Sequence, residues 1–245
     1  MEKRISIVTG AAKGIGKAIV ERFVNDNYFV VAVDVDEENG NNLLSEFGSD
    51  KVKFIKADIC NENDVQALFG KVKAEFSRVD VLVNNAGIIR DNMIWNMPVE
   101  DFDLVVNINL KGTWLMCREA GKLMKQQNSG RIVNIASRAW LGNRGQSNYS
   151  ASKAGVVGMT RVLALELGKY NVCVNAIAPG LIDTPLTQKL EKEVLQKLID
   201  AQPTRTMGLP ADVANAVAFL SSEKTQFITG QTLYVDGGKS IGAGI

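Results

Sequence analysis

Short apolar runs rich in β-branched residues recur along the whole chain, and amphipathic helical stretches separate most of them. The apolar runs cover residues 5–8, 29–33, 52–55, 79–83, 132–135, 172–177 and 232–235. Nearly continuous apolar runs of this length are typical of strands in a parallel sheet that is buried between two layers of helices. We therefore predict an α/β fold of the doubly wound type, a mostly parallel seven-stranded sheet with helices on both faces. Ligands are expected beyond the carboxyl ends of its strands.

The alternation continues without a linker, a low-complexity segment or a repeat, so we predict a single domain over residues 1–245. Residues 180–207 are the least regular stretch, because Pro185 and Pro203 flank a helical pattern at 190–200. We interpret residues 180–207 as a substrate lid, since this segment follows a strand and such loops often close over the chemistry. An ordinary helical insertion at the surface is the alternative.

Composition excludes several classes of function. The chain has 28 Lys and Arg against 27 Asp and Glu, so its charge gives no reason for it to bind nucleic acid or an anionic membrane. No apolar stretch approaches the length of a membrane span, and Met1 lies too close to the first apolar run for a signal peptide. We expect a cytoplasmic protein that acts on a small molecule.

The residue types available for catalysis are also restricted. Histidine is absent, which removes the commonest general base and the commonest metal ligand. Cys60, Cys117 and Cys173 lie far apart in apolar runs and show no metal-like spacing, so we interpret them as small buried hydrophobes. We predict no metal site, and any acid–base chemistry must use another residue.

A glycine-rich turn follows the first apolar run and reads Thr-Gly-Ala-Ala-Lys-Gly-Ile-Gly at residues 9–16. Its glycines let the backbone approach a pyrophosphate, and the helix that begins near Ile15 offers free N–H groups and a positive dipole end. Asp34 ends the second run about twenty residues on, where a carboxylate can accept hydrogen bonds from ribose hydroxyls. Together these features predict a Rossmann-type dinucleotide site. The residues of the turn assigned to it are Gly10, Lys13, Gly14, Ile15 and Gly16.

Asp34 also bears on the choice of cofactor. A 2′-phosphate beside its carboxylate would bring like charges together, so we favour NAD(H) over NADP(H). Lys13 favours the opposite choice, because a cation in the glycine loop could reach a 2′-phosphate. Asp34 could instead serve a turn or cap a helix, although Asp36 is better placed for capping.

Further motifs follow in an order that resembles the short-chain dehydrogenase/reductase family, from about residue 3 to residue 238. They are the turn at 9–16, Asn84-Asn85-Ala86-Gly87, Asn109, Ser137, Tyr149 with Lys153, and Pro179-Gly180. Alone, residues 84–87 would pass as a turn and 179–180 as a loop breaker, and only the combination is specific. Within the family the chain most resembles the 3-oxoacyl-thioester reductases, especially at residues 84–92 and 145–155.

The resemblance implies further cofactor contacts and a homotetramer. The contacts outside the glycine turn are Asp58, Ile59, Asn85, Ala86, Gly87, Tyr149, Lys153, Pro179, Gly180, Ile182 and Thr184. The implied interfaces involve the helices around Met116 and Met159 and the region of the C-terminal strand. Sequence physics supports only a weaker statement, which is that the helix at 149–168 is apolar on more than one face, as expected beneath a neighbouring subunit.

Tyr149 and Lys153 are four residues apart, so on a helix they project from one face. An ammonium group about 4 Å from a phenol, at an effective dielectric near ~20, favours the phenolate by roughly 4 kcal/mol. That amount would lower the pKa of tyrosine by about 3 units towards neutrality, so we predict Tyr149 as the general acid and base. The alternative is that both residues lie on the solvent-exposed surface of the helix and have no catalytic role.

The resemblance gives roles to three further groups. Ser137 is implied to hydrogen-bond the substrate oxygen, Lys153 also to hold the nicotinamide ribose, and Asn109 to join a water relay that reaches Lys153. Without the cofactor turn, Ser137 and Asn109 would be read as residues that cap or bend helices.

We expect an oxidoreductase that interconverts a secondary alcohol and a ketone with NAD(H). The substrate pocket is expected from Ile89, Met93, Ile94, Trp95, Ala139, Trp140, Leu141 and Gln146. This mainly apolar set favours a neutral, fairly hydrophobic carbonyl compound, although Trp95 and Trp140 could equally be packing residues.

Two other functions stay open. A 3-oxoacyl-thioester reductase is the first alternative, and it is disfavoured by Asp34 and by the neutral Gln126-Gln127, where basic residues could help hold an acidic acyl carrier protein. A non-catalytic NAD(H)-binding sensor or scaffold is the second, but a pure binder has no need of the set Ser137, Tyr149 and Lys153.

Overall fold

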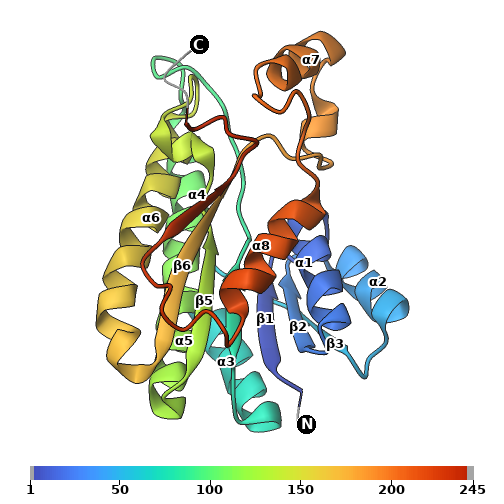
Figure 1. Cartoon of the computed structure of the whole chain (residues 1–245), viewed down its shortest axis with the longest axis vertical. Coiled ribbons are helices and arrows are strands. Elements are labelled where there is room, and N and C mark those ends of the chain that lie inside the picture. The colour runs from blue at the N-terminus through green and yellow to red at the C-terminus, as the bar shows by residue number, and fades with distance from the viewer. Residues whose placement is uncertain (1–2, 242–245) are drawn as a thin grey trace.

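The computed structural model describes residues 3–241, so Met1 and both ends of the predicted 1–245 domain lie outside the described residues. These residues form one sheet with the strand order β3-β2-β1-β4-β5-β6-β7, in which every pairing of neighbouring strands is parallel (Figure 1). The strands are β1 (Ile5–Thr9), β2 (Phe29–Asp34), β3 (Val52–Lys56), β4 (Val81–Asn84), β5 (Gly130–Ile135), β6 (Val172–Pro179) and β7 (Thr232–Val235). The predicted doubly wound α/β fold is confirmed.

Each predicted strand is present, and the ends differ from the expectation by no more than two residues. One such difference is at β4, which begins at Val81 rather than at Val79. Side chains bind this stretch in place of part of the ladder: the Asp80 carboxylate accepts the Ile5 N–H at 2.7 Å, and the Gln127 side chain accepts the Val79 N–H at 2.9 Å.

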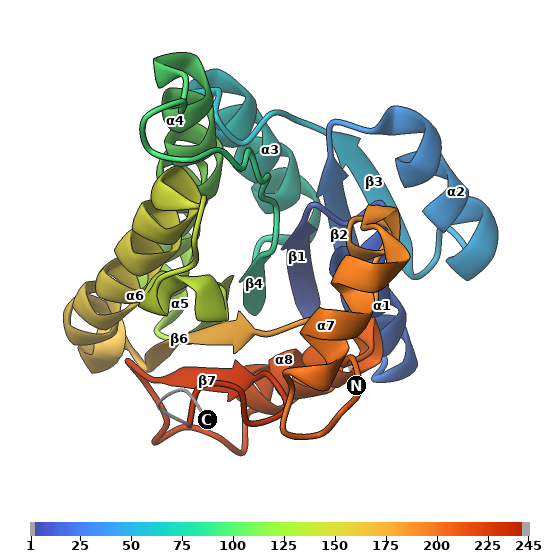
Figure 2. The same cartoon turned by 90° about the horizontal axis from the view of Figure 1, so that it is seen from above.

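Helices cover both faces of the sheet, as Figures 1 and 2 show. The helices are α1 (Gly14–Asn25), α2 (Glu37–Phe47), α3 (Glu62–Phe76), α4 (Val99–Val106), α5 (Thr113–Gln127), α6 (Ser147–Leu167), α7 (Lys192–Asp200) and α8 (Pro210–Ser221). A π-helical turn (Asn107–Gly112) joins α4 to α5, and short 3₁₀ turns occur at Arg138–Leu141, Gly168–Tyr170 and Thr187–Lys189.

Alternate side chains of the strands supply two separate cores. Ile7, Leu82 and Ile132 face α3 and α5, whereas the next residue of each strand faces α1, α2 and α8. Because both faces are buried, the strands need apolar residues at consecutive positions, which explains the continuous runs in the sequence.

The strand order reverses between β1 and β4. In an open parallel sheet the loops after two such strands diverge, and the crevice between them is the usual ligand site. The glycine turn follows β1, and the Asn84–Gly87 motif begins at the end of β4. The fold therefore brings the two motifs to the same edge of the sheet.

Two glycines in the middle of helices provide a test of the packing against α2. A Cβ at Gly40 would lie 2.1 Å from the Phe54 ring, whereas nothing lies within 4 Å of a Cβ at Gly70 in α3. We expect Gly70→Ala to stabilise the protein by ~0.5–1 kcal/mol through helix propensity. Gly40→Ala should destabilise it by roughly 1–3 kcal/mol, because the ring must move. Urea unfolding of both variants checks this, and a Gly40→Ala variant as stable as wild type would contradict the packing.

Candidate active site

The glycine turn is tied to the loop after β4 by Thr9 and Asn85. The Thr9 hydroxyl accepts the N–H groups of Asn85 and Ala86 at 3.0 and 3.1 Å. The Asn85 amide donates in turn to the carbonyls of Thr9 and Gly10 at 3.1 and 2.9 Å. The two backbones are so close that a Cβ at Gly10 would lie 2.8 Å from the Ala86 Cα. Gly10, Asn85 and Ala86 are thus brought together as predicted.

The start of α1 has the features that a pyrophosphate needs. Lys13 caps the helix without a side-chain hydrogen bond, so the first-turn amides have no side-chain cap. Gly14 has φ +55°, which favours glycine, and a Cβ at Gly16 would lie 2.0 Å from the Gly10 carbonyl oxygen. Ile15 is partly buried against the α1 side of the core. A dinucleotide phosphate fits this turn.

Asp34 stands at the end of β2 and supports the same turn. Its carboxylate accepts the Ala12 N–H at 3.0 Å and the Asp36 N–H at 3.1 Å. Each carboxylate oxygen has a further lone pair, so both can still accept ribose hydroxyls. Lys13 does not stand free beside Asp34, because its ammonium lies 3.3 Å from the carboxylate of Asp36. Asp36 is also the N-cap of α2, as the sequence indicates.

The other predicted cofactor residues are distributed along the same edge. Asp58 is exposed and accepts the Cys60 N–H at 2.9 Å, while Ile59 is buried in the core beside the π-helical turn. Pro179 ends β6, and the Gly180 N–H donates to the Val235 carbonyl at 2.9 Å. The Ile59 side chain therefore packs in the protein core.

The segment after β6 approaches the glycine turn. The Thr184 methyl group lies 3.8 Å from the position that a Cβ of Gly14 would take. Ile182 is buried and pairs with Gly208 across an isolated bridge, which closes the base of the predicted lid. Ile182 and Thr184 thus bring residues 180–207 against the turn.

Ser137, Tyr149 and Lys153 lie near one another, where β5 ends and α6 begins. Ser137 follows β5 and caps the short 3₁₀ turn by accepting the Ala139 N–H at 3.1 Å. Tyr149 and Lys153 lie one turn apart on α6, and the Lys153 Nζ is 5.7 Å from the Tyr149 ring centroid. The buried Nζ donates to the Ile135 carbonyl at 2.7 Å, which fixes the ammonium against the end of β5. Lys153 is therefore buried and is not a solvent-exposed residue on the surface of the helix.

The protonation of this group differs from the expectation drawn from spacing. Burial raises the pKa of Tyr149, a hydrogen bond with Ser137 lowers it, and the charge of Asp91 raises it, with a net upward shift. Burial also lowers the pKa of Lys153 to about 8. The predicted fall of the Tyr149 pKa is therefore not produced by the protein groups alone, because removal of a phenolate from water is the largest effect.

Asn109 lies in the π-helical turn and holds the loop after Gly87. Its side-chain oxygen accepts the Ile88 N–H at 2.8 Å, and its amide donates to the Ile88 carbonyl at 3.0 Å and to the Ser152 hydroxyl at 3.2 Å. A Cβ at Gly87 would lie 3.1 Å from the Asn109 side-chain oxygen and 3.5 Å from the Lys153 Nζ. The predicted relay stays a prediction, but Asn109, Gly87 and Lys153 do lie together.

Sequence reasoning missed a carboxylate near the tyrosine. Asp91 raises the pKa of Tyr149 through its charge, and both of its oxygens accept from the Gln146 amide at 3.0 Å. Asn148, next to the tyrosine, is fully buried and donates to the Arg90 carbonyl at 2.9 Å. The adjacent polar residues Asp91 and Asn92 within an apolar loop could have indicated this carboxylate. The sequence does not indicate its contact with Gln146.

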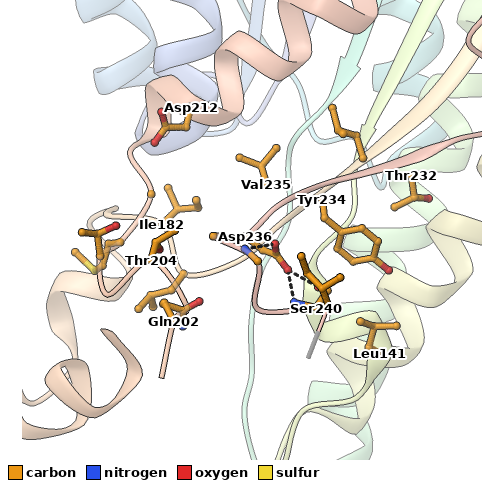
Figure 3. Close-up of a pocket in the computed structure, with 18 residues that line it drawn as sticks. Leu141, Ile182, Gln202, Thr204, Asp212, Thr232, Tyr234, Val235, Asp236 and Ser240 are labelled. Carbon is orange, nitrogen blue, oxygen red and sulfur yellow. Dashed lines mark hydrogen bonds between the residues drawn. The ribbon is translucent and has the colours of Figure 1, made fainter. Parts of the chain in front are cut away.

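The predicted substrate residues differ in burial, and Ile89 and Met93 are partly buried. Ala139 and Gln146 are buried, and the partly buried Trp140 packs against the small cluster around Val156 and Ala178. Ile94 and Trp95 are exposed, Trp95 by 72%. Leu141 also lines a cavity of about 810 Å³ between the lid and the segment after β7 (Figure 3).

Tyr149 is not among the residues that line that cavity. Its lining includes Ile182 and Met207 from the lid, and Tyr234 and Asp236 from the C-terminal end of the chain. Asp236 accepts hydrogen bonds from Gly238 and Ser240, as Figure 3 shows for Ser240. Among the described residues, the lining contains two carboxylates, Asp212 and Asp236, and no cationic side chain, so the cavity disfavours an anionic group.

The structure also bears on the expectations for the cysteines, for metal binding and for a membrane span. Within residues 3–241, Cys117 and Cys173 are buried free thiols, whereas Cys60 is half-buried and differs from the expectation. No group of three or more His, Cys, Asp or Glu in the described part of the chain is arranged to hold a metal ion. None of the helices described between residues 3 and 241 combines the length and apolar character needed to cross a bilayer.

Comparison with known proteins identifies the family. The model of a family described as "Enoyl-(Acyl carrier protein) reductase" matches residues 10–240. A crystal structure of the protein gox2181 has a TM-score of 0.95 and 32% sequence identity, over 99% of this chain and 97% of that one. The chain belongs to the short-chain dehydrogenase/reductase family and is therefore an oxidoreductase, and the family implies a nicotinamide cofactor.

Curated relatives extend over the whole chain. The (2S)-[(R)-hydroxy(phenyl)methyl]succinyl-CoA dehydrogenase subunit BbsD of Thauera aromatica is 44% identical over 100% of this chain and 99% of its own length. The 3-oxoacyl-[acyl-carrier-protein] reductase FabG of Thermotoga maritima is 40% identical over 97% and 98%. The predicted resemblance to 3-oxoacyl-thioester reductases is confirmed.

The charge of Asp91 should affect the pH dependence of the reaction. Asp91→Asn removes a charge that raises the pKa of Tyr149, so this pKa should fall. For alcohol oxidation, which needs the tyrosine deprotonated, the acid limb of kcat/KM should then move to lower pH. Asp103→Asn, which removes an exposed charge from α4, is the control and should leave the profile in place. An acid limb that moves upward in Asp91→Asn would refute this electrostatic role.

Proposed function

We propose that the protein is an NAD(H)-dependent oxidoreductase that interconverts a secondary alcohol and a ketone, with Tyr149 as the proton-transfer residue. The observation that carries the proposal is the convergence of Ser137, Tyr149 and the buried Lys153 ammonium at the sheet edge that also holds the glycine turn. A binding protein without catalysis has no use for a lysine that is 4% exposed and lies 5.7 Å from the centroid of a tyrosine ring.

The chemistry follows from the protonation of these groups. The nicotinamide, when bound, supplies or accepts the hydride. In reduction, Tyr149 donates its proton to the substrate oxygen, and in oxidation it takes that proton back. The raised pKa of Tyr149 keeps the phenol protonated at neutral pH, which suits the reducing direction. Ser137 donates a hydrogen bond to the same oxygen and so fixes its distance from the phenol.

Lys153 acts on the proton that Tyr149 exchanges. Its ammonium favours the phenolate that forms when the proton leaves, although burial lowers the lysine pKa to about 8. The carbonyl of Ile135 and the space beside Gly87 fix its position. Asn109 borders this space and connects it to the loop at Ile88, which supports its assignment to a relay.

NAD(H) is the proposed cofactor. Asp34 has lone pairs free for the ribose hydroxyls while it holds the glycine turn, and its charge opposes a 2′-phosphate. Lys13, the residue that favours NADP(H), has its ammonium 3.3 Å from Asp36. The remaining cofactor assignments at Asp58, Pro179, Gly180, Ile182 and Thr184 belong to the same proposal.

The second candidate is a reductase or dehydrogenase of acyl thioesters. It is favoured by the names of the two curated relatives, of which one is a reductase of a 3-oxoacyl carrier protein and the other a dehydrogenase of a substituted succinyl-CoA. Against the carrier protein stands the neutral pair at the end of α5: Gln126 is exposed, and the Gln127 side chain is engaged by the Val79 backbone.

The proposal includes a lid over residues 180–207 and a single functional domain. In α7 no residue is buried, and Val194 and Leu198 expose apolar surface shortly before Gln202, which lines the cavity. The helix stands above the sheet in Figure 1, attached through the hydrogen bond from the Lys239 Nζ to the Ala201 carbonyl at 2.7 Å. An apolar face without cover suits a segment that closes over a bound substrate.

A homotetramer is also proposed, with the helices around Met116 and Met159 at one interface and the region of the C-terminal strand at another. Met116 is fully buried in the core of its own chain, so it cannot contact a partner. Trp114 on α5 and Leu165 on α6 expose apolar surface instead, Leu165 by 85%, and they belong to the helices named in the expectation. Such patches are typical of surfaces that pair between subunits.

Substitution of the tyrosine tests the proton-transfer role. Tyr149→Phe should retain NADH binding and lower turnover by roughly 10²- to 10⁴-fold, because the hydroxyl is the proton donor and acceptor. Tyr170→Phe is the matched control, since Tyr170 lies between Lys125 and Lys169 at the far end of α6. NADH fluorescence titration and steady-state kinetics measure both effects. Substantial activity in Tyr149→Phe would remove Tyr149 from this role.

A substrate panel separates the candidate functions. We expect NADH oxidation with cyclic and aryl ketones, because the residues predicted to form the substrate pocket are mainly apolar. A strong preference for an acetoacetyl thioester would favour the second candidate. Stoichiometric NADH binding without turnover over the whole panel would point to a non-catalytic sensor or scaffold.

A further inference from the structure

Lys13 in the glycine turn forms an ion pair with a carboxylate at the start of α2. The Lys13 ammonium lies 3.3 Å from the Asp36 carboxylate, and Asp34 lies two residues before Asp36 at the end of β2. The Lys13 side chain is 66% exposed, so nothing but this pairing fixes the direction in which it extends.

Asp36, in contrast, is held firmly by the helix that it caps. One of its oxygens accepts the Asn39 N–H at 3.2 Å, and the other accepts from the Asn39 side chain at 2.9 Å. Its own N–H donates to Asp34 at 3.1 Å. The hydrogen bonds from Asn39 are the largest of the effects that lower the pKa of Asp36, and Lys13 adds to them, so Asp36 is ionised at neutral pH.

We propose that Asp36 is a specificity-determining residue for the cofactor, because it engages the Lys13 ammonium that would otherwise pair with a 2′-phosphate. This inference rests on the proposed function, since it assumes that the adenosine end of a dinucleotide lies beside Asp34. It adds a second residue to the discrimination that Asp34 provides.

The charges of Lys13, Asp34 and Asp36 explain why the two carboxylates have different effects on a 2′-phosphate. With Lys13 neutralised by Asp36, the uncompensated charge at the end of β2 is the carboxylate of Asp34. A phosphate with close to two negative charges then meets repulsion without a counter-charge. Removal of the Asp36 charge leaves the ammonium free to pair with the phosphate, while Asp34 and its hydrogen bonds stay in place.

The test uses Asp36→Asn, which removes the charge and keeps a residue that caps helices equally well. The probes are 2′,5′-ADP and 5′-AMP, which differ only in the 2′-phosphate, followed by NADP⁺ and NAD⁺. Calorimetric titration should show that 2′,5′-ADP and NADP⁺ bind roughly three- to tenfold more tightly to Asp36→Asn than to wild type. The affinities for 5′-AMP and NAD⁺ should not change.

Two further variants isolate the contribution of Lys13. In a Lys13→Met background, Asp36→Asn should give little or no gain for 2′,5′-ADP, because the cation that it releases is gone. The matched control is Glu46→Gln, which breaks the exposed pair of Lys17 in α1 with Glu46 in α2 at 2.7 Å. This variant makes the same change in net charge between the same two helices and should leave all four affinities unchanged.

The outcomes separate this inference from the proposed function. An equal gain with and without Lys13 would mean that Asp36 acts by direct repulsion, and it would overturn the engagement of Lys13. Unchanged 2′,5′-ADP affinity in Asp36→Asn, with NAD⁺ binding intact, would overturn the inference and leave the proposed function standing. If wild type binds none of the four probes, the proposed function fails first.

Discussion

Thr9 and Asn85 fasten together the two loops that flank the reversal of the strand order. Their four hydrogen bonds hold the glycine turn and the loop after β4 so close that a Cβ at Gly10 has no room. Since all the strands are parallel, the loops after β2, β5 and β6 leave the same edge of the sheet. The position of Ser137, Tyr149 and Lys153 relative to the glycine turn therefore depends on this junction and on the register of β4 with β5.

The fold could be predicted from the sequence because the residues of each strand indicate whether its two faces are buried. Consecutive apolar residues such as Leu82 and Val83 are needed only where both faces of a strand are covered, and this pattern is visible without any distant contact. The candidate site was predictable for a different reason. Tyr149 and Lys153 lie within one helical turn, so their spacing fixes their relation once the helix is assigned.

The features that sequence reasoning missed all depend on contacts between distant segments. Gln146 meets Asp91 from 55 positions away, and Gln127 binds the backbone of Val79 from 48 positions away. The direction of the Tyr149 pKa was missed for a related reason: spacing gives the distance to Lys153, but the burial that raises the pKa comes from the whole surrounding structure. Lys13 was read as a free cation because its partner belongs to another helix.

The π-helical turn at Asn107–Gly112 places an irregularity inside an otherwise continuous rod from α4 to α5. A π turn accommodates an extra residue, so side chains on its two sides are rotated relative to those of an uninterrupted α-helix. The rod can thus present Asn109 to the Ile88 loop while Val105 and Leu115 still reach buried positions. A local change in helical winding consequently lets one segment pack on the sheet and also bind the loop at Ile88.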